Sequence, residues 1–210
     1  MEELVRAWRA LITPHTSSPA AEDVGRALLA SWSESHRRYH DLVHLRGVLA
    51  AIDELAALAV DPDAVRLAAW YHDAVYEGSP DDEENSARRA EAELASLGVA
   101  AELVAEVARL VRMTVEHDPD PGDRNAEVLS DADLAALAVG AEDYRRNTAA
   151  IRSEYAHVSD EAFRAGRLRA IESLLVGPRL YRTAVAQDRW EGRARANLRA
   201  ELAALDVTTN

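Results

Sequence analysis

The chain has 210 residues, of which 48% are hydrophobic and none is cysteine. These values predict one globular domain with a sizeable core, and the absence of thiols excludes disulfides, thiolate metal sites and a cysteine nucleophile. The formal net charge of −13 argues against a nucleic-acid duplex as partner, because neutralising its phosphates requires a basic surface.

The N-terminal sequence and the hydropathy pattern bear on where the protein acts. Residues 1–6 lack the basic segment and apolar stretch that open a signal peptide. No uncharged apolar run approaches the roughly 18 residues that would indicate a membrane span. We therefore expect a cytoplasmic protein with no membrane partner, and the missing cysteines fit a reducing compartment.

Helical periodicity runs through the whole chain. Apolar residues recur at helical spacing, as at Leu4, Trp8 and Leu11, and pairs such as Asp61-Pro62 are typical of helix starts. The predicted helices span 2–12, 20–36, 38–58, 63–76, 81–97, 100–115, 126–138, 142–156, 160–176 and 186–205. No alternating pattern indicates a strand. The sequence thus predicts an all-α, single-domain helical bundle over residues 1–210.

Two histidines, His40 and His44, lie one helical turn apart and therefore share a helix face. His36 extends this stripe by another turn. The spacing is also that of a zinc-protease motif, but Asp41 is one methylene shorter than the glutamate used there as general base. Metal binding remains one interpretation, and a stripe that caps, packs or faces solvent is the other.

A second group of ligand type is His72-Asp73, which follows the apolar residues Leu67, Ala68 and Ala69. An ionised aspartate beside such a core is costly unless it is paired or bound to metal. Adjacent helical side chains diverge by about 100°, so a shared cation would lie in the wedge between them. The alternative is an aspartate that ends a helix beside a surface histidine.

The third group is Asp131 and Asp133, which lie about 200° apart on a helix, so only one can face a shared site. Helix capping is the alternative, with Ser130 as N-cap. Imidazole and carboxylate ligands suit divalent transition metals. Such a metal, with positions left for water and substrate, can promote hydrolysis of a phosphate ester.

Taken in order, His44, His72-Asp73 and Asp133 resemble the ligand set of the HD superfamily of metal-dependent phosphohydrolases. One branch of predicted phosphohydrolases is similar in further motifs between about residues 28 and 205. These motifs are Arg37-x-Tyr39-His40, Tyr71-His72-Asp73-x-x-Tyr76, an acidic segment ending Ser86-Ala87, Thr114-x-x-His117, Ile151-Arg152-x-Glu154-Tyr155, Gly166-Arg167, Tyr181-x-Thr183 and Ala194-Arg195-x-Asn197-Leu198. The resemblance implies an HD-type bundle that hydrolyses a phosphate ester of a nucleotide or another small phosphorylated metabolite.

The resemblance also implies a metal centre. Its ligands would be His44, His72, Asp73 and Asp133, holding one divalent ion (Mn, Co, Ni, Fe, Zn or Mg) whose bound hydroxide attacks the ester. Asp133 is preferred to Asp131 because the family's terminal Ala-Asp pattern falls on Ala132-Asp133, and Asp131 would then lie behind the ligands.

Catalytic and substrate-binding roles follow from the same resemblance. The branch has Asp-Asn-Glu where this chain has Asp81-Asp82-Glu83. Glu83 is our candidate general acid or base, and Glu77 is the competing candidate. Asp73 would serve in catalysis as well as being a metal ligand. The candidate substrate contacts are Arg37, Tyr39, His40, His117, Arg152 and Arg167, with Arg195 as a further arginine. Salt bridges are the alternative role for the arginines, and a structural role or a second metal is the alternative for His117.

Two other functions compete with the hydrolase. A di-iron oxygenase of the same fold needs extra histidines between His72-Asp73 and Asp133, and only His117 lies in that interval. A non-catalytic helical module that has kept the metal is the second rival. The alanine-rich helices could pack as a homodimer or within a monomer core.

Overall fold

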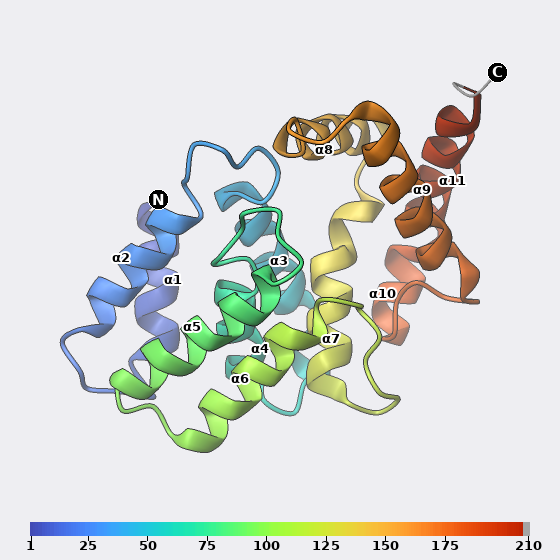
Figure 1. Ribbon diagram of the computed structural model, residues 1–210. Coiled ribbons are helices and arrows are strands. Elements are labelled where there is room, and N and C mark those ends of the chain that lie inside the picture. The colour runs from blue at the N-terminus through green and yellow to red at the C-terminus, as the bar shows by residue number, and fades with distance from the viewer. Residues whose placement is uncertain (208–210) are drawn as a thin grey trace.

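The computed structural model describes residues 1–207, with side chains as far as Leu205, and within this range every regular element is a helix (Figure 1). The elements in chain order are α1 (Glu2–Ile12), α2 (Ala21–Ser31), α3 (Leu42–Leu55), the 3₁₀ helix η1 (Ala56–Leu58), α4 (Pro62–Tyr71), α5 (Asp82–Ser96), α6 (Ala101–Met113), α7 (Arg124–Asp133), the 3₁₀ helix η2 (Leu134–Ala138), α8 (Ala141–Glu154), α9 (Asp160–Val176), α10 (Ala184–Arg189) and α11 (Glu191–Val207). The predicted all-α class is confirmed. The predicted helix 20–36 ends early, at Ser31, and the predicted helix 186–205 is divided into α10 and α11.

The helix that carries His44 begins at Leu42, although the prediction began it at residue 38. Asp41 is its N-cap, and the carboxylate of Asp41 accepts hydrogen bonds from the backbone amides of Val43 and His44. A side chain that satisfies the free amides of a first turn fixes where the helix starts. His44 therefore lies in the first turn of α3, and the role of Asp41 as a helix cap agrees with setting the zinc-protease motif aside.

The predicted helix 63–76 is shorter in the structure, because α4 ends at Tyr71. His72 is its C-cap residue, and Asp73 lies in the turn that follows. The two side chains are thus not held at adjacent positions of a continuing helix. The turn after α4 frees Asp73 from the helical divergence of about 100°.

The predicted helix 126–138 begins at Arg124 as α7 and continues into η2. Ser130 is buried in the second half of α7 and is not an N-cap. Asp131 and Asp133 accordingly lie near the C-terminal end of the helix, where a negative charge gains nothing from the helix dipole. The capping interpretation of these two aspartates is wrong, so their burial needs another explanation.

Two apolar clusters form the core. The N-terminal cluster joins α1 to α7 and includes the fully buried rings of Trp32, Trp70 and Tyr71. The C-terminal cluster joins η2 and α8 to α11, and Trp190 packs against both clusters. Within the N-terminal cluster α3, α4 and α7 contact one another, near the middle of Figure 1. This packing brings the start of α3 to the ends of α4 and α7.

No helix among the described residues is both long enough and apolar enough to cross a membrane.

The contact between α1 and α2 depends on one glycine. A Cβ at Gly25 would overlap the indole ring of Trp8, whose Nε1 donates to the carbonyl of Ala21 at 2.8 Å. We expect Gly25→Ala to destabilise the protein by about 1–3 kcal/mol through overpacking. Gly47→Ala is the matched control, since a Cβ there meets nothing within 4 Å, and it should stabilise α3 by roughly 0.5–1 kcal/mol. Urea unfolding of both variants measures these changes. Equal changes of the same sign in the free energy of unfolding would contradict the prediction.

Candidate metal centre

Three side chains from separate helices meet at one point beneath the surface. The Nε2 atoms of His44 and His72 are 3.3 Å apart, and Oδ1 of Asp133 lies 3.0 Å from the first and 3.5 Å from the second. One donor atom from each residue lies within 4.8 Å of the others. His44, His72 and Asp133 can therefore hold one metal ion.

Asp73 completes the predicted ligand set. Its Oδ2 lies 3.1 Å from Nε2 of His72 and 3.7 Å from Nε2 of His44. The structure thus brings together all four residues that the sequence predicted as ligands. Their arrangement offers two nitrogen and two carboxylate donors, which suits divalent Mn, Fe, Co, Ni or Zn.

The orientation of His72 is fixed from behind. Its Nδ1 lies 2.9 Å from the carbonyl oxygen of Ala69, one turn back in α4. A carbonyl only accepts, so Nδ1 carries a proton, and Nε2 is the nitrogen that faces the cluster and presents a lone pair whenever the ring is neutral. A histidine that donates its second ring nitrogen to a carbonyl is the usual arrangement of a metal ligand. The ring of Trp32 lies against the same imidazole, with centroids 5.4 Å apart.

The charges of the cluster depend on one another. Burial by itself would lower the pKa of His72, but Asp73 and Asp133 raise that pKa well above its ordinary value. Burial would likewise raise the pKa of Asp133, but His72, His117 and His44 hold that pKa well below its ordinary value. Burial opposes ionisation of Asp73 as well, but His72, His40 and His44 lower its pKa. Both aspartates therefore favour ionisation, and the site requires positive charge from protons or from a cation.

Asp131 has a different role from Asp133. Its side chain is fully buried, and its two oxygens each accept a hydrogen bond of 2.7 Å from the backbone amides of Arg182 and Thr183. Asp131 thus ties α7 to the segment before α10 and is not a ligand. The preference for Asp133 as the ligand agrees with the geometry.

A cavity of about 270 Å³ opens beside the four ligands. Its walls come from both halves of the molecule: the loop before α3, α5, α7, η2, α8 and α9 all contribute lining residues. Tyr39, His40, Glu83, His117 and Arg167, five of the predicted site residues, line it.

Glu83 lies in the first turn of α5 and faces this cavity. Burial raises the pKa of its carboxyl, and the charges of Asp73 and Asp82 raise it further. Glu83 therefore holds a proton more readily than an exposed glutamate. The competing candidate, Glu77, has an exposed side chain that lines a separate hollow with His36.

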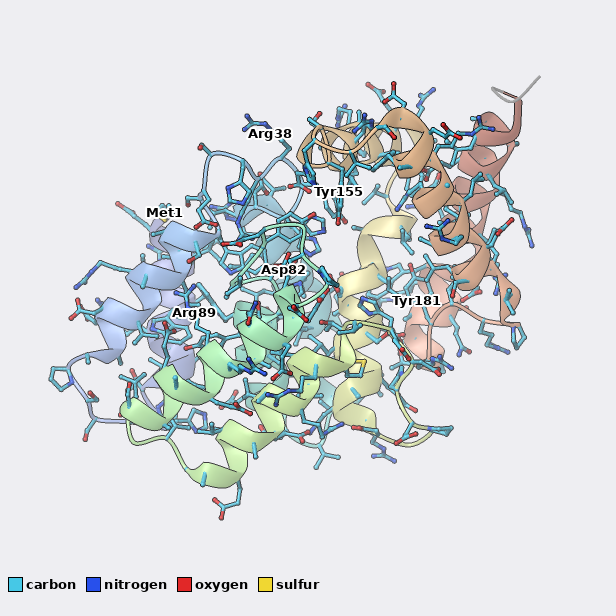
Figure 2. All side chains as sticks on the ribbon, in the orientation of Figure 1. Met1, Arg38, Asp82, Arg89, Tyr155 and Tyr181 are labelled. Carbon is cyan, nitrogen blue, oxygen red and sulfur yellow. The ribbon has the colours of Figure 1, made fainter. Side chains whose placement is uncertain are left out.

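Asp82 explains why this loop tolerates an aspartate where an asparagine was expected. Its Oδ2 accepts from the backbone amides of Glu77, Gly78 and Ser79 at 2.8–3.0 Å. An asparagine oxygen could accept the same three hydrogen bonds. Figure 2 shows Asp82 at the start of α5, beside the loop that it holds. Asp82 therefore shapes the cavity wall without facing the ligands.

His117 contacts the second oxygen of Asp133, at 3.3 Å from its Nε2. Its backbone has a φ of 50°, which no other non-glycine residue shares among the described residues. A left-handed conformation is unfavourable for a side chain of this size and is often found at functional sites. His117 thus contacts Oδ2 of Asp133, whereas His44 and His72 lie next to Oδ1 of the same carboxylate.

Three of the predicted arginine contacts prove to be structural. Arg37 has a fully buried side chain that donates to the carbonyls of His40 and Asp73 and to Glu34. Arg152 donates to Asp160 and to the carbonyls of Tyr155 and Val158, and Arg195 donates to Glu191 and Gly177. None of the three lines the cavity. The prediction of substrate contact is therefore wrong for Arg37, Arg152 and Arg195, which instead join segments of backbone.

Arg167 does reach the cavity, but it is held there by Glu201. Its Nε and Nη2 lie 2.8 and 3.0 Å from the two carboxylate oxygens of Glu201, and Nη2 lies 3.3 Å from the hydroxyl of Tyr144. This bidentate pair fixes the guanidinium plane. Arg167 can offer a substrate only the donors that Glu201 leaves free.

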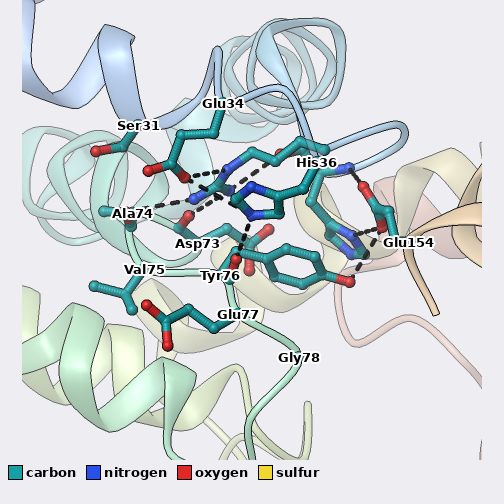
Figure 3. A network of polar contacts seen from close by, with 12 residues as sticks. Ser31, Glu34, His36, Asp73, Ala74, Val75, Tyr76, Glu77, Gly78 and Glu154 are labelled. Atoms are coloured by element: carbon teal, nitrogen blue, oxygen red, sulfur yellow. Dashed lines mark hydrogen bonds and ion pairs between the residues drawn. The ribbon is translucent and has the colours of Figure 1, made fainter. Parts of the chain in front are cut away.

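The residue that sequence reasoning missed is Glu154, at the end of α8, whose carboxylate is 2% exposed. Its Oε1 accepts from the backbone amides of Arg38, Tyr39 and His40 at 2.7, 2.8 and 3.0 Å. Its Oε2 accepts from Nδ1 of His40 at 2.7 Å and from the hydroxyl of Tyr76 at 3.1 Å (Figure 3). Glu154 therefore fixes the turn before α3 and one wall of the cavity.

The same contacts decide the role of His40. Its ring lies between those of Tyr39 and Tyr76, with centroids 4.8 and 4.2 Å away. Since Nδ1 donates to Glu154, His40 belongs to this wall and not to the ligand cluster. Glu154 stood inside a motif of the resemblance, but no spacing rule connects it with a turn more than a hundred residues earlier.

Comparisons with known proteins add no relative. No family model, no curated protein and no solved structure matches this chain.

Glu154 should stabilise the fold in a pH-dependent manner. Burial alone would raise its pKa, but hydrogen bonds from His40 and the backbone amides lower it to about 2. A depressed folded pKa contributes stability above the unfolded value of about 4.3, and this contribution is lost as the pH falls towards 2. We expect Glu154→Gln to cost about 2 kcal/mol at pH 7.

Urea unfolding at pH 7 and at pH 3.5 measures this difference. The difference in the free energy of unfolding between wild type and Glu154→Gln should be smaller at pH 3.5, because the wild type then loses part of the carboxylate's contribution to stability. Glu161→Gln, an exposed carboxylate on α9, is the control. A difference of equal size at both pH values would show that the charge of Glu154 contributes nothing.

Proposed function

We propose that this protein is a metal-dependent phosphohydrolase that cleaves a phosphate ester of a nucleotide or another small phosphorylated metabolite. One observation carries the proposal: His44, His72, Asp73 and Asp133 converge beside a cavity that also holds a protonatable carboxyl. The order and spacing of these residues resemble the HD superfamily, which supports the same reaction class.

The donor set fits a resident divalent metal. His44 and His72 would supply nitrogens and Asp73 and Asp133 oxygens, so protein ligands would leave positions for water and substrate. A metal bound there polarises a phosphoryl oxygen and lowers the pKa of a coordinated water. The fixed orientation of His72 and the ionised state of Asp133 are features of the chain itself that favour such binding.

The other residues of the cavity manage protons and position the substrate. Glu83 lies close enough to Asp73 for the two charges to interact, and its raised pKa suits a group that donates a proton to the leaving oxygen. Arg167 offers a fixed positive charge in the opposite wall. His40 and Tyr39 form the side wall that Glu154 fixes.

A second candidate, a dinuclear oxygenase, is favoured by one contact. Asp133 presents Oδ1 to His44 and Oδ2 to His117, so His117 could help to hold a second metal. Glu83 is the other carboxyl in that wall. Two irons per chain would support the oxygenase. A chain that binds one metal and turns over no phosphate ester would instead support a non-catalytic binding module.

The experiment is phosphate release from a panel of nucleotides and sugar phosphates, with Mn²⁺, Co²⁺, Ni²⁺ and Mg²⁺ in turn. We expect turnover that requires metal and is abolished in Asp73→Asn. Glu83→Gln should lose about 10²-fold or more in kcat, the usual contribution of a general acid, whereas Glu77→Gln should match wild type. Absence of turnover in metal-loaded wild type would overturn the proposal, and an unchanged Glu83→Gln would remove that residue's role.

A further inference from the structure

Nearly every polar side chain that lines the cavity has a partner within the chain. His40 and Tyr76 bind Glu154, Tyr144 and Arg167 bind Glu201, Thr114 and Thr148 donate to carbonyls of their own helices, and His117 contacts Asp133. Besides the carboxyl of Glu83, the hydroxyl of Tyr39 and the side-chain amide of Asn147 in this wall have no hydrogen-bond partner among the described residues.

These two groups lie where the cavity meets a second hollow. A groove of about 680 Å³ runs along α3, η2 and the start of α8. The cavity and the groove share five lining residues, namely Tyr39, His44, Asp133, Ala136 and Asn147. We call this shared region the neck. Two of the four metal ligands belong to it, so a molecule that reaches from the metal into the groove passes Tyr39 and Asn147.

The chemistry of the neck suits an anion that is bound next to carboxylates. The asparagine amide offers two N–H donors without a charge. The hydroxyl of Tyr39 is likewise an uncharged donor at neutral pH. A lysine or arginine at the neck would form a salt bridge to the ligand carboxylates. Neutral donors avoid this salt bridge and can still bind a phosphoryl oxygen.

We propose that Asn147 is a substrate-binding residue that donates its amide to a phosphoryl oxygen at the neck, which Tyr39 also lines. This assignment rests on the proposed function and extends it, since it names a residue that neither motif nor resemblance indicated. Asn147 comes from α8, whose last residue, Glu154, also fixes the turn that carries Tyr39. One helix therefore supplies one donor directly and positions the other.

The test is calorimetric titration of inorganic phosphate into the full chain loaded with Mn²⁺. Asn147→Ala should weaken phosphate binding about tenfold, the value of one net hydrogen bond. Asn147→Asp keeps the shape and adds a negative charge, so it should weaken binding by about a hundredfold. Ser153→Asp adds the same charge on an exposed position of α8 and should bind phosphate as wild type does.

Two further measurements separate the outcomes. Thermal unfolding and Mn²⁺ affinity should be unchanged in Asn147→Ala, because the amide makes no hydrogen bond among the described residues that the alanine would lose. In turnover assays Asn147→Ala should raise KM more than it lowers kcat. Wild-type phosphate affinity in both Asn147 variants, or no phosphate binding by metal-loaded wild type, would overturn this assignment. The proposed function fails separately, if metal-loaded wild type releases no phosphate from any ester.

Discussion

The structure depends on the burial of two aspartates beside two histidines at the junction of α3, α4 and α7. Asp73 and Asp133 are less than one-sixth exposed, and both lie within 4 Å of a histidine nitrogen. Buried carboxylates are stable only when positive charge and hydrogen bonds replace the water they lose. The packing of the three helices enforces this arrangement. A divalent cation would supply the positive charge that the two carboxylates need, so the imidazoles would not have to be protonated to supply it.

A second buried carboxylate connects the two halves of the molecule. Glu154, from the C-terminal half, accepts five hydrogen bonds from the turn before α3 and from Tyr76. Asp131 makes the reverse connection, from α7 to the segment before α10. These two contacts attach the end of α8 and the segment before α10 to the N-terminal half. The cavity therefore exists because polar contacts, as well as the apolar contact of Trp190, join the two clusters.

The sequence predicted the helical class from its periodicity, and the four converging candidate ligands from their chemistry together with a motif resemblance. It misplaced the ends of the helices that carry them, since the Asp41 cap and the turn after Tyr71 override periodicity. It assigned Arg37 and Arg152 to substrate, because a motif does not show that a guanidinium is already satisfied by backbone carbonyls. Glu154 and Asn147 could not be found, because their importance comes from contacts between α8 and residues far away in the chain.

The most direct test is the metal content of purified wild type and of two matched histidine variants. His72→Ala removes a ligand, and His36→Ala removes an exposed imidazole outside the cluster. After equilibration with Mn²⁺ and removal of excess ion, wild type and His36→Ala should retain one ion per chain and His72→Ala none. Equal metal content in His72→Ala and wild type, or no retained metal in any of the three, would contradict the central claim that these four residues form a metal centre.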